Sequence, residues 1–208
     1  GSDNRTKNII DEFKSVSKIN VRHSFQNDIG FRAARSRNKA IAKAKGEYVI
    51  LVDGDMILHP KFILDHSRNA EPGCFIQGSR VLLSSLKTKN ALNTKKISFN
   101  NFSFGFKNRK NAIHSNILAN FFSIKKNYLA GIKTCNFSFY RMDCILVNGF
   151  NNEFEGWGRE DSDFALRLMN AGVKRKNLKF NAIQYHLWHK EVSRNSLSYN
   201  DAMLQKVI

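Results

Sequence analysis

Two aspartates separated by one glycine, Asp53 and Asp55, directly follow the apolar run Tyr48–Val52. An uninterrupted apolar run of this length predicts a strand that is buried on both faces. Ligands of open α/β sheets bind beyond the carboxyl ends of the strands, so both carboxylates are expected at a binding edge. Carboxylate oxygens suit a hard divalent cation, and such a cation neutralises a diphosphate. Asp-Gly is also common in ordinary turns, so the triplet alone is compatible with a surface turn that has no binding role.

A second acidic group, Glu160, Asp161 and Asp163, lies in the first turn of a helix that is predicted to end at Gly172. Carboxylates at a helix N-terminus are stabilised by the helix dipole, so simple capping explains one or two of them. Capping does not explain Trp157, which stands between two glycines. An exposed indole offers a sugar ring an apolar face, and a nearby carboxylate can act as a general base on a hydroxyl.

Two histidines, His186 and His189, form a third group near the C-terminus. Neutral imidazole can complete a cation site that carboxylates begin, although a structural histidine at a strand end is the commoner case. Three arginines, Arg32, Arg35 and Arg37, precede the Asp53 strand and either bind phosphate or uracil groups or form a solvated helix face.

The composition is that of one globular domain with a strong positive charge. The 208 residues are 42% hydrophobic, which is enough for a sizeable core, and no apolar run approaches the length of about 20 residues that a spanning helix needs. Three cysteines without CxxC spacing argue against a disulfide framework or a zinc ribbon. The net charge of +17 favours a polyanionic partner, such as nucleic acid, acidic lipid or a phosphorylated small molecule, unless it is only a lysine-rich surface.

The elements that position these residues alternate between helix and strand through the first 70 residues, which is typical of an α/β fold. Periodicity predicts helices over residues 4–17, 31–45, 113–124, 160–172 and 196–208. It predicts strands over residues 19–25, 48–52, 74–83 and 135–140. Residues 84–111, which are basic and polar with interleaved phenylalanines, are expected to form a long loop with short ordered pieces.

The stretch from Asn38 to Asp55 resembles the donor-binding half of family 2 glycosyltransferases of the GT-A fold. Residues 136–141 and 149–161 are similar to the acceptor segment of β-1,4-galactosyltransferases and bacterial chondroitin-type polymerases. The resemblance implies an α/β GT-A domain over residues 1–190, with a mostly parallel sheet flanked by helices. Its parts would be a donor half (1–83), a loop or lid region with a helix (84–134) and an acceptor half (135–190), followed by a tail helix (191–208). Residues 1–6 resemble a segment that normally follows the second strand, which implies that the chain lacks the first β-α-β elements.

The resemblance also implies a role for each candidate residue. These roles are metal ligation by Asp55 with His186 or, alternatively, His189; catalysis by Asp161 as the base; acceptor binding by Trp157 and Glu160; and contact with the donor nucleotide by Arg32 and Asp53. The cofactor would be Mn²⁺ or Mg²⁺.

The resulting hypothesis is an inverting, metal-dependent glycosyltransferase that moves a hexose or hexosamine from a UDP-sugar to a saccharide or lipid-linked saccharide. Synthesis of a bacterial surface polysaccharide or glycolipid is expected, in the cytoplasm or peripherally at the inner face of an anionic membrane. One alternative is a catalytically incomplete fragment that acts as a binding module. A basic nucleic-acid-binding protein is disfavoured, because no RNP-like pattern, zinc-finger spacing or basic heptad region is present.

Overall fold

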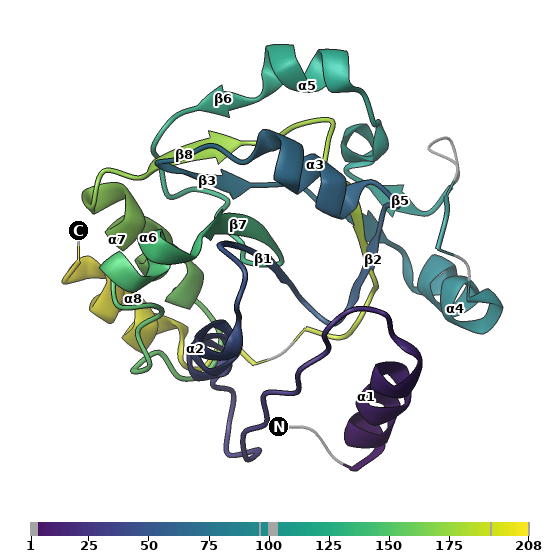
Figure 1. The fold of residues 1–208 in the computed structure, drawn as a ribbon, viewed down its shortest axis with the longest axis horizontal. Coiled ribbons are helices and arrows are strands. Elements are labelled where there is room, and N and C mark those ends of the chain that lie inside the picture. The colour runs from purple at the N-terminus through teal and green to yellow at the C-terminus, as the bar shows by residue number, and fades with distance from the viewer. Residues whose placement is uncertain (1–3, 96, 100–103, 192, 208) are drawn as a thin grey trace.

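This computed structural model describes residues 4–95, 97–99, 104–191 and 193–207 (Figure 1). The helices are α1 (Asn4–Val16), α2 (Ala33–Lys43), α3 (Phe62–Asn69), α4 (Ser85–Thr94), the 3₁₀ helix η1 (Arg109–Ala112), α5 (Asn116–Phe122), α6 (Arg141–Leu146), α7 (Glu160–Asn170) and α8 (Leu197–Gln205). The strands are β1 (Tyr48–Val52), β2 (Met56–Leu58), β3 (Cys74–Gln77), β4 (Val81–Leu83), β5 (Phe106–Lys107), β6 (Ile124–Lys125), β7 (Asn136–Tyr140), β8 (Lys174–Asn177) and β9 (Gln184–His186). None of these helices is long and apolar enough to cross a bilayer.

The strands form two mixed sheets, one of five strands in the order β1-β7-β3-β8-β6 and one of four in the order β2-β9-β4-β5. Within the described part of the chain, β3 with β8 and β4 with β9 are the parallel pairs, and every other pair is antiparallel. The α/β class is therefore confirmed, but the prediction of a mostly parallel sheet is wrong, because β7 enters the larger sheet antiparallel to both β1 and β3. The expected match of residues 1–6 to a family segment stays a prediction, since residues 1–3 lie outside the described ranges.

Several local predictions need correction. Residues 19–25 are not a strand, and Ile19 and Phe25 are exposed rather than paired in a sheet. The strand at 48–52 exists, but it lies at the end of its sheet and is only half-buried, so it is not covered on both faces. The expected strand at 74–83 divides into β3 and β4, which belong to different sheets. The region 84–111 contains α4, whose first turn is capped by the Ser84 hydroxyl, which accepts from the Lys87 amide at 3.2 Å.

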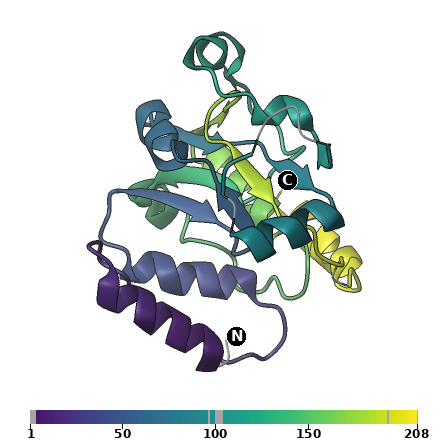
Figure 2. The same ribbon diagram turned by 90° about the vertical axis from the view of Figure 1, so that its right-hand side faces the viewer.

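Helices cover both faces of the larger sheet because strand side chains alternate in direction. On one face, Phe137 and Phe139 of β7 pack with Phe164 of α7 and with Ala34 and Ile41 of α2. On the other face, the buried Phe62 of α3 packs against β3 and the residues that follow β8. Helices α2 and α7 thus share one core, and this brings their polar ends together. Figure 2 shows α1 and α2 at the opposite end of the molecule from α5.

Candidate active site

One carboxylate and two imidazoles meet where the two sheets adjoin. Asp55 lies in the turn between β1 and β2, and β2 pairs with β9 so that Met56 is opposite His186. The Leu187 amide also donates to the Asp55 carbonyl at 2.9 Å. As a result, the Nε2 atoms of His186 and His189 each lie 3.1 Å from Asp55 Oδ2.

The chemistry of these donors fits a divalent cation. Asp55 Oδ1 is buried and has no hydrogen-bond partner among the described residues, so it is available as a ligand atom. Burial lowers the pKa of His186, and the neighbouring charges of Arg80 and His189 act in the same direction, although Asp55 opposes them. The neutral imidazole that results is the form that binds a metal. Mn²⁺ accepts mixed nitrogen and oxygen ligands, so two imidazole nitrogens with a carboxylate are compatible with it.

A second group of possible ligands, His59, Asp65 and His114, has a different geometry. The two imidazole rings are stacked at 5.0 Å with an interplanar angle of 12°, so their in-plane lone pairs do not point at a common atom. Asp65 instead accepts from the Ala182 amide at 2.9 Å and lies 3.0 Å from His114 Nε2. This group ties α3 to the segment before β9 and is assigned a structural role.

Arg37 on α2 connects three carboxylates. Its Nη1 donates to Glu160 Oε1 at 3.0 Å and to Asp161 Oδ1 at 3.1 Å, and its Nη2 lies 3.6 Å from Asp53 Oδ1. Asp161 also accepts from Thr134, at 2.8 Å from the hydroxyl and 2.9 Å from the backbone amide. Through Arg37, the Glu160–Asp161 pair is linked to the Asp53–Asp55 turn, although more than a hundred positions separate them in the sequence.

Burial changes the ionisation of two of these carboxyl groups. Burial and the neighbouring Asp161 charge raise the pKa of Glu160 to about 7, against the opposing effect of Arg37. The pKa of Asp53 is also raised, first by burial and further by Asp161 and Asp55, while Arg37 again opposes the shift. Glu160 therefore takes up or releases a proton near neutral pH.

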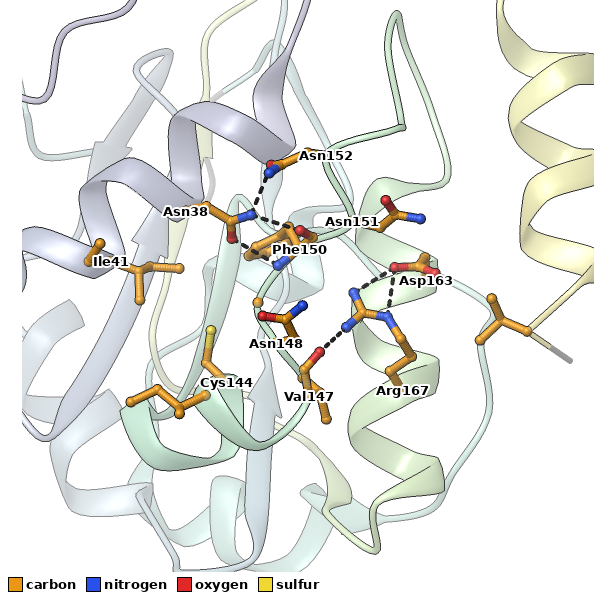
Figure 3. Close-up of a pocket in the computed structure, with 14 residues that line it drawn as sticks. Asn38, Ile41, Cys144, Val147, Asn148, Phe150, Asn151, Asn152, Asp163 and Arg167 are labelled. Carbon is orange, nitrogen blue, oxygen red and sulfur yellow. Dashed lines mark hydrogen bonds and ion pairs between the residues drawn. The ribbon is translucent and has the colours of Figure 1, made fainter.

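Asn38, next to Arg37, fixes the loop that leads to this pair (Figure 3). Its side-chain amide donates to the Phe150 carbonyl at 2.7 Å, and its side-chain oxygen accepts from the Phe150 amide at 2.8 Å. The Phe150 ring then stacks on Phe164 of α7 at 4.1 Å and lies 5.5 Å below the Arg37 guanidinium. The start of α7 is consequently held against α2 by polar and apolar contacts together.

Trp157 is held by the chain on both sides of the loop. The Gly156 amide donates to the Phe31 carbonyl at 2.8 Å, and Asn200 of α8 donates to the Gly158 carbonyl at 2.9 Å. Gly156 has φ +74°, and a Cβ there would lie 2.1 Å from the Ser196 hydroxyl, so only glycine fits. The indole remains 38% exposed, with the Arg194 guanidinium 4.9 Å from its ring centre.

A cleft of about 1170 Å³ joins these groups. Of the residues predicted from the sequence, its walls include Asp53, Asp55, Trp157, His186 and His189. Glu160 and Asp161 are not among the lining residues, but Arg37, which is, pairs with both of them. Arg32 does not line the cleft either, and its guanidinium donates to the Asn27 carbonyl at 2.8 Å.

Sequence reasoning gave too little weight to three residues of this site, Arg37, Thr134 and Arg80. Arg37 lies three positions after Ala34 and four before Ile41, which are the buried residues of α2. This spacing puts Arg37 on the inner face of the helix and distinguishes it from Arg32 and Arg35. Thr134 and Arg80 carry no comparable signal, since they become part of the site only through the packing of distant segments.

The fold and the cleft define a glycosyltransferase of the GT-A class. The chain belongs to glycosyl transferase family 2, whose family model matches residues 1–130. A model described as the N-terminal domain of galactosyltransferase matches residues 114–190.

Relatives with known names share this domain within longer proteins. The chain is 27% identical to chondroitin synthase from Escherichia coli over 89% of its own length and 29% of that protein. It is 25% identical to hyaluronan synthase from Pasteurella multocida over 83% of its length and 19% of that protein. It is 43% identical to human beta-1,4-galactosyltransferase 7 over 49 residues, which are 24% of this chain and 14% of that protein. The chain thus spans less than a third of each of these relatives.

Solved structures confirm the fold. GalNAc-T7 with UDP, GalNAc and Mn²⁺ superposes with a TM-score of 0.64 at 12% identity, over 99% of this chain and 40% of that one. S. aureus TarS 1-349 superposes with a TM-score of 0.62 at 13% identity, over 100% of this chain and 53% of that one.

Proposed function

We propose that this domain catalyses metal-dependent, inverting transfer of a hexose or hexosamine from a UDP-sugar to a saccharide acceptor. The observation that carries the proposal is the meeting of the Asp55–His186–His189 group and the Arg37-linked carboxylates at one cleft. Two relatives are named as synthases of chondroitin and hyaluronan, and one structural neighbour contains UDP and Mn²⁺. These names support the choice of donor and acceptor classes. Synthesis of a bacterial surface polysaccharide or glycolipid in the cytoplasm is part of the same proposal.

The donor side of the cleft combines a cation site with a positive side chain. Asp55, His186 and His189 would hold Mn²⁺ or Mg²⁺, and the bound ion would neutralise the negative charge of the departing diphosphate. Arg80 lines the same cleft, and its charge acts on both Asp53 and His186. We expect this guanidinium to contact the diphosphate, because Arg presents several donors to phosphate oxygens.

The acceptor side supplies a base and a stacking surface. Asp161 would accept the proton of the acceptor hydroxyl, while that oxygen forms a bond to the anomeric carbon and the diphosphate oxygen leaves from the opposite face. Thr134 fixes the orientation of the Asp161 carboxylate. Trp157 offers its exposed ring face to a sugar, and Glu160, beside the base, would bind an acceptor hydroxyl.

This assignment requires Arg37 to change partners during the reaction. In the structure its guanidinium pairs with both Glu160 and Asp161, and neither carboxylate is among the residues that line the cleft. An anionic donor in the cleft provides a competing partner for the guanidinium. We propose that donor binding draws Arg37 away from Glu160 and Asp161 and makes both carboxylates accessible to the acceptor.

The test is a panel of nucleotide sugars with a UDP-release readout, with Mn²⁺, Mg²⁺ or a chelator. We expect release with a UDP-hexose or UDP-hexosamine in the presence of metal, and a loss on the order of 10² to 10³ in the Asp55→Ala and Asp161→Asn variants. Asp11→Asn, on the exposed side of α1, is the matched control, and circular dichroism establishes folding. Turnover that is close to wild type in either site variant would refute the assignment. Binding of UDP and metal without turnover by the wild-type chain would instead indicate a binding module.

A further inference from the structure

The segment of residues 113–124 carries apolar side chains that point to solvent. Ile117 and Phe121 lie one turn apart on α5 and are 71% and 78% exposed, and the adjacent Phe122 is 56% exposed. Ala119, on the inner side of the helix, is buried. Helix α5 and strand β6 lie along the outer edge of the molecule, away from α2 and the cleft it borders (Figure 1). Bulky apolar residues that are gathered in this way mark an interaction surface.

The surroundings of this helix are strongly basic. Every charged residue from position 72 to position 142 is Lys or Arg. Lys110 precedes α5 in η1, and Lys125 and Lys126 follow it at β6. Asp65, which contacts His114 just before α5, is buried, and the exposed Glu71 pairs with Lys125. One of these lysines is therefore neutralised, and the others leave a net positive rim.

Lys179 joins this rim through direct contacts with the α5 segment. Its amide donates to the Ser123 hydroxyl at 3.1 Å, and the next residue, Phe180, has its ring 5.6 Å from that of Phe122. Partial burial lowers the pKa of Lys179, and the positive charges of Lys110 and Arg175 lower it further. Arg175 is buried and donates to the backbone carbonyls of Tyr128 and Ala130, so Lys179 and Lys110 are the exposed cations of this group that a surface anion can meet.

The helix is fixed in this position rather than loosely attached. The Ser115 hydroxyl caps it by accepting from the Leu118 amide at 3.3 Å, and the Ser115 amide donates to the Phe180 carbonyl at 2.9 Å. The apolar side chains are consequently presented before any partner binds, which lowers the entropic cost of binding.

We propose that the α5 face, defined as Ile117, Phe121, Phe122 and Ile124 with Lys110, Lys126 and Lys179 around them, docks on an anionic phospholipid bilayer. The apolar side chains would enter the boundary between headgroups and acyl chains, and the lysines would contact lipid phosphates, so the protein lies on the membrane without crossing it. This inference goes beyond the proposed transfer reaction and does not depend on it.

Other occupants fit these observations less well. A second copy of the chain packed face to face would place the two basic rims against each other, and like charges at an interface are unfavourable. A single-stranded nucleic acid would stack on aromatic rings, but the aliphatic Ile117 and Ile124 offer it nothing comparable.

The experiment is co-sedimentation of the 208-residue chain with vesicles of phosphatidylcholine, with and without phosphatidylglycerol. We expect binding to the anionic vesicles, weakened by salt, and a loss of at least about tenfold in the partition coefficient for the double variant Ile117→Ser/Phe121→Ser. Leu146→Ser, which alters an exposed apolar side chain on α6, is the matched control and should leave binding unchanged. Unchanged thermal unfolding and circular dichroism would show that the variants remain folded.

A second pair of variants separates charge from insertion. Lys110→Glu/Lys126→Glu should also weaken binding about tenfold, whereas Lys39→Glu on the exposed side of α2 should have little effect. If the serine variant binds anionic vesicles as well as wild type, insertion is refuted and the face is only a polyanion site. Tighter binding to an oligonucleotide than to vesicles would overturn the proposal in favour of nucleic acid. A dimer in sedimentation equilibrium that the serine variant dissociates would overturn it in favour of self-association.

Discussion

Replacement of Arg37 by methionine tests the electrostatic core of the site. Methionine keeps an unbranched side chain but removes the guanidinium that lies over the Phe150 ring and that pairs with Asp53, Glu160 and Asp161. Loss of one partner from a buried ion pair costs about 3–5 kcal/mol, because the remaining charge is left without compensation. The Arg37 side chain is 18% exposed and that of Asp53 is 44% exposed, so solvent screens part of the interaction. We therefore expect a loss of stability at the lower end of this range, about 3 kcal/mol at pH 8.

The loss of stability caused by Arg37→Met should increase as the pH rises. Without Arg37, the pKa values of Asp53 and Glu160, which burial already raises, are expected to rise further. The folded state then binds more protons than the unfolded state, so the free energy of unfolding falls as the pH rises. We therefore expect a small loss at pH 5, where protonation relieves the repulsion, and the full loss at pH 8.

The assay is urea unfolding at both pH values, with Arg35→Met as the control. Arg35 is exposed on the same helix, so its substitution changes the net charge equally without touching the carboxylates of the site. The reasoning is refuted if the free energies of unfolding of the two variants differ by less than about 0.5 kcal/mol at pH 8. It is also refuted if Arg37→Met loses more stability at pH 5 than at pH 8.

Three further substitutions test other parts of the site. His186→Ala should weaken Mn²⁺ binding at least about tenfold in calorimetry, and an unchanged dissociation constant would remove His186 from the cation site. Glu160→Gln removes a carboxyl group whose pKa is about 7 in the folded state, so the wild type loses stability as the pH rises from about 4.5 to 7 and this group ionises. At pH 8 the free energy of unfolding of the variant should therefore exceed that of the wild type by up to about 3 kcal/mol, and a lower value there would contradict the assigned shift. Gly156→Ala should destabilise at least about 1 kcal/mol more than Gly131→Ala in thermal unfolding, because both glycines have positive φ (+74° and +76°) but only the first would clash with Ser196; equal losses would show that the loop yields.

Local sequence patterns predicted the elements whose signal is short-ranged. The apolar run at 48–52, the strand at 136–140 and the helices that begin at Asn4 and Glu160 all form close to their expected bounds. Asp55 meets the 186–189 segment as the family resemblance implied, although both His186 and His189 lie against it rather than one of them. The separation of the chain into donor, lid and acceptor parts stays a prediction.

Strand direction and strand partners could not be predicted in the same way. Nothing in the sequence of β7 shows that it lies antiparallel between β1 and β3, since this depends on how distant segments return to the sheet. The same limit explains the false strand at 19–25, where the residue types favour a strand but no neighbouring strand pairs with it in the described structure. The ion pair between Arg37 and Asp161 could not be predicted either, because it forms only when α2 and α7 pack into the same core.

The energetics of this charge cluster argue for a functional origin. Taking one guanidinium and three carboxylates partly out of water carries a desolvation cost that their mutual attraction does not clearly recover. Apolar side chains of similar volume would stabilise the contact between α2 and α7 at least as well, because Phe150 and Phe164 already form an aromatic stack beneath it. Glu160 shows the cost directly, since burial raises its pKa to about 7 although Arg37 donates to it. A cluster that costs stability, lies behind a large cleft and holds a carboxylate oriented by Thr134 is better explained by proton transfer than by folding.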